Sequence, residues 1–571
     1  MESSGAHIIW ECLARQGVDT VFGYPGGSVL NLYDALLDFP GIHHVLARHE
    51  QGACHMADGY ARASGKVGVV VATSGPGATN LVTGLATAMM DSVPLVALTG
   101  QVRSPLLGTD AFQEVDVTGI TLPVTKHTYL VRRAEDIVPV LREAFALATS
   151  GRPGAVLVDV TADAQKATAV FDWEGNAPHR HLRHLPPRPD PEQIQKALKL
   201  IRAARRPVIL AGRGIELSGA RPEVLAFAEK TSTPIATTLL ALGTIPASHP
   251  LNLGMMGMHG ESWTNQAIQE SDLLLAFGMR FDDRVTGDLQ TYAPRAKKIH
   301  IEIDASELHK NVKVDVPVLA DLREALDVLL PRVKANRHPE WLARIKDLRG
   351  DADPDAILVD QGSLRAPQVI HELWKGTGGQ ATIVSDVGQH QMWEAQYYKH
   401  DDPRSLITSG GLGTMGFALP AAIGAKLACP GKEVWVVAGD GGFQMNIQEL
   451  MTLVQEGVKV NIAVINNGYL GMVRQWQELF YQGRYAATPM LNPDFVKLAR
   501  AYGIPGRAVA SLAETPSAIA EARGTEGPFL IEFRVEQETC VYPMVPSGAA
   551  LHQMLRREPA GAESRHPSEE P

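Results

Sequence analysis

Two polar motifs in the last third of the chain contain the residue types of a magnesium and phosphate site. A Gly-Asp-Gly sequence centred on Asp440 follows the apolar run VWVVA, and an Asn-Asn sequence ending at Asn467 follows the run NIAVI. Mg²⁺ prefers oxygen ligands and commonly shares them with phosphate groups. Asp440 offers a carboxylate, Asn467 an amide oxygen and the turn at Tyr469 a backbone carbonyl, while Gly441 and Gly442 let a diphosphate approach the backbone. Together the motifs predict a site for Mg²⁺ and a diphosphate.

A second phosphate motif lies shortly before the first. Gly411, Gly413 and Gly416 fit the pattern G-x-G-x-x-G ahead of a helix-like segment, and Asp440 lies about where a ribose-binding acid would fall. A dinucleotide site is therefore an alternative for this segment. It leaves the Asn-Asn motif unexplained, so we favour the metal and diphosphate interpretation.

The elements that must position these motifs follow from the hydrophobic pattern. Apolar, strand-sized runs such as VGVVVATSG, PVILAGRG and VWVVAGDGG alternate with helix-like segments through nearly the whole chain. Such alternation predicts an α/β protein with parallel sheets, helices on both faces and right-handed crossovers. Because neighbouring parallel strands end at the same edge of a sheet, we expect Asp440 and Asn467 at one edge.

Two changes in composition divide the chain. Residues 179–193 are rich in proline and charge, and a second break falls between His338 and Gln361. We therefore predict three doubly wound domains at residues 1–170, 190–335 and 360–545, followed by a tail at 546–571.

The overall composition excludes several classes of protein. The 571 residues are 45% hydrophobic and carry a net charge of −10, which argues against a disordered chain and a nucleic-acid binder. The four cysteines form no CxxC pair, so a zinc ribbon or disulfide framework is not expected. The sequence contains no signal-peptide pattern and no apolar run of membrane-spanning length. We expect a cytoplasmic protein without nucleic-acid or membrane partners.

The first third of the chain adds a family resemblance. Its stretch VLARHEQGACHMADGYARASGKVGVVVATSGPGATN, taken with the Asp440 and Asn467 motifs, resembles the thiamine diphosphate (ThDP) enzymes. Their first domain binds the coenzyme's pyrimidine ring and their third binds its diphosphate. The resemblance places Glu50 at the glutamate that hydrogen-bonds the pyrimidine and activates the coenzyme. A charge that complements a helix dipole is the simpler alternative for Glu50.

The same resemblance implies further contacts with the coenzyme. Gly388, Gln389 and His390 match a second diphosphate contact, Gly413 a carbonyl that accepts from the 4′-amino group, and Met415 the side chain between the two rings. A core role is the alternative for Met415. In this family the first and third domains meet across a subunit interface. Glu50 of one chain would then face Asp440 of another, in a homodimer or homotetramer.

Six further stretches sharpen the resemblance to the catalytic subunits of acetolactate synthase. They are FGYPGGSVLNLYDAL, TDAFQEVDVTGITLPVTKH, FGMRFDDRVTG, SGGLGTMGFALPAAIGA, NNGYLGMVRQWQELFY and VYPMVPSG. The resemblance implies that pyruvate is decarboxylated and joined to a second pyruvate or to 2-ketobutyrate. The products would be 2-acetolactate or 2-aceto-2-hydroxybutyrate, the first common step of valine, leucine and isoleucine biosynthesis. A separate regulatory subunit would be a possible partner.

Substrate residues and a flavin are implied in the same way. Arg284 matches an arginine that recognises the second carboxylate, Trp476 a residue that favours 2-ketobutyrate, and Gln113 and Lys126 residues of the substrate channel. An ion pair with Asp282 or Asp283 and a core position are the alternatives for Arg284 and Trp476. The middle domain is expected to bind FAD, which does no redox work in the net reaction. The matching residues are Arg152, Gly212, Arg213, Gly214, His259, Arg280, Glu302 and Asp321.

Departures and competing interpretations are few. The family commonly has serine where this chain has Gly442, and alanine where it has Ser28. A pyruvate oxidase or a glyoxylate carboligase would also bind ThDP and FAD, but the latter lacks the activating glutamate. A simple decarboxylase carries a His-His pair after that glutamate, where this chain has TDAFQEVD. A flavin-independent, catabolic acetolactate synthase would lack the RFDDRVTG pattern. A catalytically silent scaffold would need neither Glu50 nor the metal motif.

Overall fold

The computed structural model describes residues 2–175, 187–350 and 354–556. Its contacts divide the chain into two units. One comprises Met1–Arg188 and Asp355–Thr539, and the other comprises Pro189–Pro354 and Cys540–Pro571. Within the described residues each unit is built on six-stranded parallel sheets, two in the first unit and one in the second. The predicted α/β class with three doubly wound sheets is therefore confirmed.

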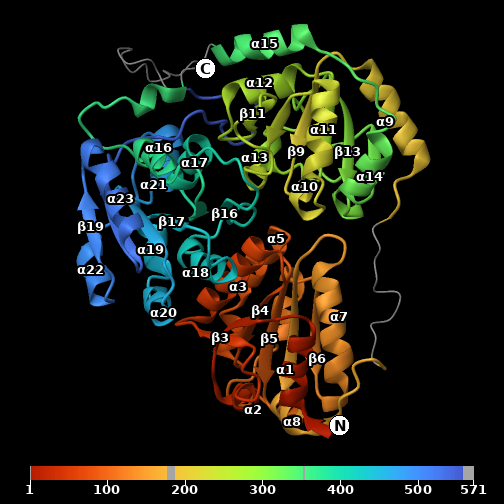
Figure 1. Ribbon diagram of the computed structural model, residues 1–571, viewed down its shortest axis with the longest axis vertical. Helices are drawn as coiled ribbons and strands as arrows, with labels where there is room; N and C mark the ends of the chain where they lie inside the picture. Colours follow the sequence, from red (N-terminus) through yellow and green to blue (C-terminus); the bar gives the residue numbers. More distant parts are fainter. Residues whose placement is uncertain (1, 176–186, 351–353, 557–571) are drawn as a thin grey trace. The chain divides into compact units, whose positions relative to one another are not determined.

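The N-terminal sheet of the first unit is drawn in red to orange in Figure 1. Its spatial order is β3 (His43–Leu46), β2 (Thr20–Tyr24), β4 (Gly68–Ala72), β5 (Leu95–Gln101), β7 (Ala155–Thr161) and β6 (His127–Val131). Alternate residues of β4 enter different cores, because side chains point to opposite faces of a strand. Val69 and Val71 pack with α1 (Gly5–Arg15) and α7 (Ile137–Thr149), whereas Val70 packs with α3 (Glu50–Ser64) and α5 (Val82–Met90).

The C-terminal sheet repeats this topology. Its spatial order is β16 (Leu406–Thr408), β15 (Thr382–Ser385), β17 (Val434–Gly439), β18 (Asn461–Asn466), β20 (Phe529–Arg534) and β19 (Gly506–Val509). Numbered within each domain, both sheets have the order 2-1-3-4-6-5. The order reverses between the first and third strands, and in open parallel sheets ligands bind in the crevice at the carboxyl ends of the strands on either side of such a reversal.

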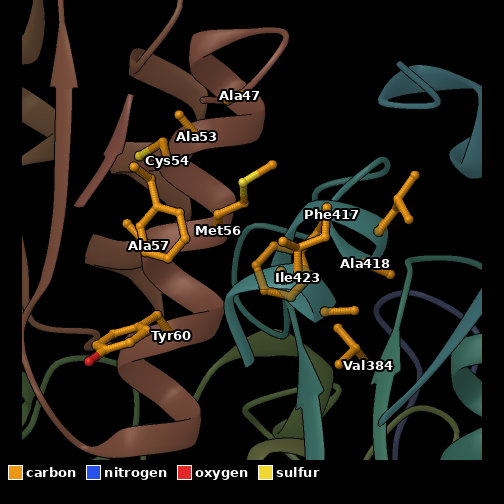
Figure 2. Close-up of a cluster of buried hydrophobic side chains, with 14 of the residues drawn as sticks. Ala47, Ala53, Cys54, Met56, Ala57, Tyr60, Val384, Phe417, Ala418 and Ile423 are labelled. Carbon is orange, nitrogen blue, oxygen red and sulfur yellow. The ribbon is translucent and has the colours of Figure 1, made fainter. Parts of the chain in front are cut away.

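Helix α3 and helix α18 (Ala418–Ala428) join the two sheets into one core. Apolar residues of both helices and of both sheets belong to a single buried cluster, part of which is shown in Figure 2. The helices are antiparallel and almost touch at two glycines. A Cβ added at Gly59 would lie 2.0 Å from the carbonyl oxygen of Ala421, and one at Gly424 would lie 1.9 Å from that of Met56.

The second unit contains a sheet of a different order. It runs β11 (Asn252–Met255), β10 (Ile235–Thr237), β9 (Pro207–Ala211), β12 (Leu273–Phe277), β13 (Lys297–Glu302) and β14 (Val316–Leu319). This is the order 3-2-1-4-5-6 of dinucleotide-binding folds, with its reversal between β9 and β12.

The segments between the domains add detail to the expected boundaries. Most of the predicted linker at 179–193 lies outside the described residues, and its last residues begin α9 (Pro191–Ala203). The second composition break contains α15 (Pro339–Gly350). Residues 546–556 of the expected tail pack in the second unit, where Leu551 is 1% exposed, and the rest of that tail lies outside the described residues. Among the described helices, none combines the length and the apolar character that crossing a membrane requires.

Candidate functional site

The carboxyl edge of the C-terminal sheet carries the Asp440 and Asn467 motifs. Asp440 begins α19 (Asp440–Met445) directly after β17 and is 2% exposed. Its Oδ1 accepts from the N–H of Gly441 at 3.1 Å, and its Oδ2 accepts from the N–H of Gly468 at 2.9 Å. The Asp440 carboxylate thus reaches the turn that carries Asn467 and Tyr469, as the spacing predicted.

Burial raises the pKa of Asp440 to about 6, although its hydrogen bonds act in the opposite direction. One of these bonds comes from Asn492, whose Nδ2 donates to Asp440 Oδ2 at 2.6 Å and to Asn466 Oδ1 at 3.0 Å. A bound cation would favour the charged carboxylate. Among the described residues no cluster of three or more His, Cys, Asp or Glu side chains could hold a metal. A site built from one carboxylate, one amide and one backbone carbonyl does not need such a cluster.

Gln389 connects the β15 and β18 ends of this edge. It is the first residue of α17 (Gln389–Tyr397), and its Oε1 accepts from Asn467 Nδ2 at 3.4 Å. Its Nε2 donates to Gln475 Oε1 at 2.8 Å and to the carbonyl of Thr539 at 3.0 Å. Asn467 Oδ1 accepts in turn from the N–H of Tyr469 at 3.1 Å. The side chains of Gln389 and Asn467 are therefore held in fixed orientations next to Asp440.

His390 and Asp386 hold the neighbouring backbone. Burial lowers the pKa of His390 to about 4, so its ring is neutral near pH 7, and its Nε2 accepts from the N–H of Gly439 at 3.3 Å. Asp386 is 1% exposed and accepts from the N–H groups of Gly416 at 2.9 Å and Ala418 at 3.0 Å. A Cβ added at Gly442 would lie 2.6 Å from Asp386 Oδ1. Glycine at 442 leaves room for that carboxylate.

Three apolar side chains pack around Gly441. A Cβ added there would be 2.7 Å from Leu470 Cδ2, 3.2 Å from Met490 Sδ and 3.5 Å from Met415 Cε. Met415 is half-buried, so it is not a fully enclosed core residue. Gly413 is exposed with φ of 71°, a conformation that suits glycine.

Glu50 lies at the carboxyl edge of the other sheet, the N-terminal one. It is the first residue of α3 and is 9% exposed. Its Oε2 accepts from Asn80 Nδ2 at 2.9 Å, and its Oε1 would lie 3.2 Å from a Cβ added at Gly77. Gln113 belongs to the same edge, because its carbonyl would meet a Cβ added at Gly75, after β4, at 2.9 Å.

Lys126 and Arg152 lie at the opposite, amino edge of this sheet. Lys126 precedes β6, and its Nζ donates to the carbonyls of Leu147 and Ser150 at the end of α7. Arg152 precedes β7, and its Nε donates to Ser92 Oγ at 2.8 Å. The structure therefore does not bring Lys126 together with Gln113 within one chain.

The length of α3 also separates Glu50 from the Gly413 turn of its own chain. Arg62, in the last turn of α3, donates to the carbonyl of Thr408 at 2.9 Å, shortly before that turn. Twelve residues of helix at 1.5 Å each place Glu50 about 18 Å from Arg62 along the axis. Glu50 and Gly413 of one chain thus lie at opposite ends of the α3–α18 pair.

In the second unit, the residues matched to a flavin lie at the carboxyl edge of the central sheet. Gly212–Gly214 follow β9, His259 follows β11, Arg280 follows β12, Glu302 ends β13 and Asp321 follows β14. Gly212 and Gly214 are packed against the next loop, since a Cβ at either would lie within 2.6 Å of Gly278 backbone.

The residues matched to a flavin differ in their hydrogen bonds and burial within the chain. Glu302 is buried and accepts from the N–H groups of Ile303 and Asp304 at 3.0 and 3.2 Å. Burial lowers the pKa of His259 to about 4. Asp321 caps α14 (Leu322–Leu329) by accepting from two backbone N–H groups, which by itself accounts for an acid there.

Arg284 and Trp476 can be compared with their simpler alternatives. Arg284 lies in α13 (Asp283–Thr286), and its Nη1 is 3.6 Å from Asp283 Oδ2, but both side chains are more than half exposed, so this pair adds little stability. Trp476 is half-buried on α21 (Gly471–Phe480), with its ring centroid 5.4 Å from that of Phe480, and is not a core aromatic.

The sequence analysis does not identify three polar residues of these sites. Asn492 contacts Asp440, Asn80 contacts Glu50, and Asp386 orders the loop beside Gly442. Asn492 is remote in sequence from the motif it supports, and none of the three belongs to a recognisable spacing. Asp386 follows a strand-like run, and that position was the one available clue.

Comparison with known proteins agrees with this arrangement. Residues 3–120 match the thiamine pyrophosphate enzyme N-terminal TPP binding domain, 194–329 the central domain, and 386–533 the C-terminal TPP binding domain. The chain is 50% identical over 559 residues to the acetolactate synthase large subunit of Corynebacterium glutamicum, covering 96% of this chain and 89% of that protein. It is 47% identical over 560 residues to that of Lactococcus lactis, covering 97% and 96%. For that of Haemophilus influenzae the identity is 44% over 568 residues, covering 97% and 98%.

Proposed function

This chain belongs to the acetolactate synthase large-subunit family of thiamine pyrophosphate enzymes, and from that premise we propose that it decarboxylates pyruvate and carries out a carboligation. One pyruvate loses CO₂, and its remaining two-carbon unit forms a carbon–carbon bond to the keto carbon of a second 2-keto acid. The second acid is pyruvate or 2-ketobutyrate, and the products are 2-acetolactate or 2-aceto-2-hydroxybutyrate. The observation that carries the proposal is this similarity over nearly the whole chain, with Glu50, Asp440 and Asn467 all present.

The residues of the C-terminal edge fit ThDP and Mg²⁺. Bound ThDP supplies a thiazolium ring that stabilises a carbanion. We assign Asp440, Asn467 and the carbonyl of Tyr469 to Mg²⁺, and Gly441, Gly442, Gly388, Gln389 and His390 to the diphosphate. The fit rests on a buried carboxylate at a strand end where the sheet order reverses, next to backbone that no Cβ covers.

Glu50 has the properties that pyrimidine activation requires. Its Oε2 is fixed by Asn80, and Gly77 leaves space beside its Oε1. We assign to Glu50 a hydrogen bond to the pyrimidine N1′, which would hold a proton there and make the 4′-nitrogen a base. Gly413 would accept from the 4′-amino group and Met415 would lie between the two rings.

A complete site on this proposal needs two chains. Glu50 begins α3, whereas the Gly413 turn lies close to Arg62, about 18 Å further along that helix, which is too far for both to contact one pyrimidine ring. A second chain related by two-fold symmetry would bring its own Glu50 to the Gly413 turn and complete two equivalent sites. We therefore propose a homodimer as the minimum active unit, with a homotetramer and a separate regulatory subunit as further assemblies.

The family resemblance supports the remaining assignments. The exposed guanidinium of Arg284 would recognise the carboxylate of the second keto acid, and Trp476 would favour the extra methyl group of 2-ketobutyrate. Gln113 and Lys126 would line the substrate channel from different chains. FAD would bind the central sheet, whose 3-2-1-4-5-6 order and glycine turn after β9 suit a dinucleotide. Arg152 is assigned to FAD on the family resemblance alone.

One experiment separates this function from its relatives. Purified protein with pyruvate, ThDP, Mg²⁺ and FAD should form acetolactate, assayed separately from acetaldehyde and hydrogen peroxide. Acetaldehyde as the main product would indicate a decarboxylase, and hydrogen peroxide would indicate an oxidase.

The matched variant is Glu50→Gln, which keeps the shape of the side chain. It should retain its fold and bind ThDP but lose turnover by a factor of roughly 10² to 10⁴. Activity close to that of the wild type would refute the assigned role of Glu50.

A further inference from the structure

The turn that carries Gly413 is held by the N-terminal domain as well as by its own, in which the N–H of Thr414 donates to Ser409 Oγ at 3.0 Å. Residues 410–413 are exposed, and a Cβ added at Gly413 would find one neighbouring atom within 4 Å, in Val387 at 3.8 Å. Asp91, which follows α5, accepts from the N–H of Gly410 at 3.0 Å and from the N–H of Gly411 at 2.7 Å. Both oxygens of one buried carboxylate thus bind consecutive amides of this turn.

Arg62 holds Asp91 in place. Its Nη2 donates to Asp91 Oδ2 at 2.9 Å, its Nε donates to Asp58 Oδ1 at 2.5 Å, and its Nη1 donates to the carbonyl of Thr408 at 2.9 Å. The three side chains are at most 4% exposed. A buried carboxylate is costly unless it is paired and fully hydrogen-bonded, so Arg62 and the two glycine amides are what make Asp91 stable here.

A second tether lies beside the first. The hydroxyl groups of Thr87 in α5 and Thr414 are 2.8 Å apart, and both side chains are buried. The turn is thus attached to α3 and α5 on both sides of Gly413.

A side chain of the C-terminal domain likewise holds backbone of the N-terminal domain. Glu449 begins α20 (Glu449–Gln455) of the C-terminal domain, and both of its oxygens accept from the N–H of Arg48 at 3.1 Å. Thr452 donates to the same carboxylate at 2.6 Å. A Cβ at Gly52 would lie 2.4 Å from Glu449 Oε1, so glycine at 52 is what lets this carboxylate reach the segment just before Glu50.

We propose that Asp91 and Glu449 are positioning residues. Each belongs to one domain and binds backbone N–H groups of the other domain in the same chain, and we call these two contacts latches. Asp91, held by Arg62, fixes the Gly410–Gly413 turn for its coenzyme, and Glu449 fixes the segment that presents Glu50. This inference rests on the proposed function, because it gives these two segments their roles. On the two-chain arrangement they serve different sites, so each chain's interdomain contact supports both sites of a dimer.

The decisive comparison is Asp91→Asn against Asp58→Asn in the full-length protein. Both remove one buried carboxylate from the same arginine, but only Asp91 contacts the turn. We expect amide hydrogen exchange at residues 409–414 of the coenzyme-free protein to accelerate by about ten- to hundredfold in Asp91→Asn, as the loss of a charged hydrogen bond implies. Asp58→Asn should lose thermal stability with exchange in the turn close to that of the wild type.

The same pair tests the link to the coenzyme. Affinity for ThDP, titrated in the presence of Mg²⁺ by intrinsic fluorescence, should fall at least about tenfold in Asp91→Asn and less than about threefold in Asp58→Asn. The near-UV circular dichroism of bound ThDP should change only in Asp91→Asn, and KM for pyruvate should change little in either variant. A role in stability alone would lower both melting temperatures and leave these readouts equal.

The other latch and a milder variant guard against a failure to fold. Thr87→Val keeps the shape of the side chain and should accelerate exchange at residues 409–414 by a smaller factor. Glu449→Gln should accelerate exchange at residues 47–51 and lower kcat without changing exchange in the glycine turn. Wild-type exchange at the turn in both Asp91→Asn and Thr87→Val would overturn the inference. A wild-type protein that neither binds ThDP nor forms acetolactate would overturn the proposed function, while the exchange result would still decide the latch.

Discussion

Replacing Gly424 by alanine tests the contact that holds the two halves of the first unit together. The added Cβ would lie 1.9 Å from the carbonyl oxygen of Met56, 2.7 Å from its carbonyl carbon and 2.9 Å from the backbone nitrogen of Tyr60. Ordinary contact begins near 3.4 Å, so α3 and α18 would have to separate by about 1.5 Å. No side-chain rotation relieves the clash, because all three atoms belong to the backbone.

The expected cost follows from that separation. Overpacking a core costs about 1–3 kcal/mol when side chains can adjust, and here a backbone must move, so we expect about 3 kcal/mol or somewhat more. Thermal unfolding should show a melting temperature lower by roughly 5 to 10 °C. The separated helices should also accelerate amide exchange in both α3 and α18.

Gly431→Ala is the matched control. Gly431 lies just beyond α18, and an added Cβ there would meet no atom within 4 Å. Its stability should change by less than about 0.5 kcal/mol, or rise slightly, because alanine restricts the unfolded chain. Equal melting temperatures for the two variants would refute the close approach of the helices.

A double variant gives a further check on the same geometry. Gly59→Ala inserts a Cβ 2.0 Å from the carbonyl oxygen of Ala421, on the other side of the same contact. Once one insertion has moved the helices apart, the second has less left to displace. The double variant should therefore lose less stability than the sum of the two single variants.

Three other outcomes are expected. Asp440→Ala should abolish Mg²⁺-dependent retention of ThDP, and calorimetry that shows unchanged affinity would contradict the metal assignment. Trp476→Leu should lower the share of 2-aceto-2-hydroxybutyrate when pyruvate and 2-ketobutyrate compete, measured as a product ratio. Burial raises the pKa of Asp159 to about 7 against hydrogen bonds from Thr99 and Gln101, so the native state binds this proton more tightly than the unfolded chain. Its contribution to stability therefore falls between about pH 4 and pH 7 and stays low above that, by roughly 1.4 kcal/mol per pKa unit. The melting temperature of Asp159→Asn should exceed that of the wild type by more at pH 8 than at pH 5.

The fold class was predictable because buried parallel strands have continuous apolar sequences. Strands such as Val434–Gly439 and Leu273–Phe277 are covered on both faces, so their sequences show no polar alternation. The spatial orders of the sheets were not predictable in the same way. They depend on which strands pair across long stretches of chain, and neighbouring strands of a parallel sheet leave no mark of their partners in the local pattern.

The common edge of Asp440 and Asn467 was predictable for a different reason. Asp440 and Asn467 follow two consecutive parallel strands that are also neighbours in the sheet, so topology alone brings them to one edge. Asn492, Asn80 and Asp91 follow no such rule, because each lies outside a strand end and its partner is fixed by tertiary packing. Hydrogen bonds of this kind become visible only once the helices are placed.

The direction of each strand explains why residues close in sequence separate into two groups. Gln113 comes after β5 has ended and is therefore at the carboxyl edge with Glu50, whereas Lys126 comes just before β6 begins and is at the amino edge. Asp91 precedes β5 and Arg152 precedes β7, so both share the amino edge, and it is there that the glycine turn of the C-terminal domain is bound. Whether a residue precedes or follows its strand thus decides at which edge of the sheet it lies. The spacing within a motif carries no such information, and for this reason one stretch, TDAFQEVDVTGITLPVTKH, contains residues of both edges.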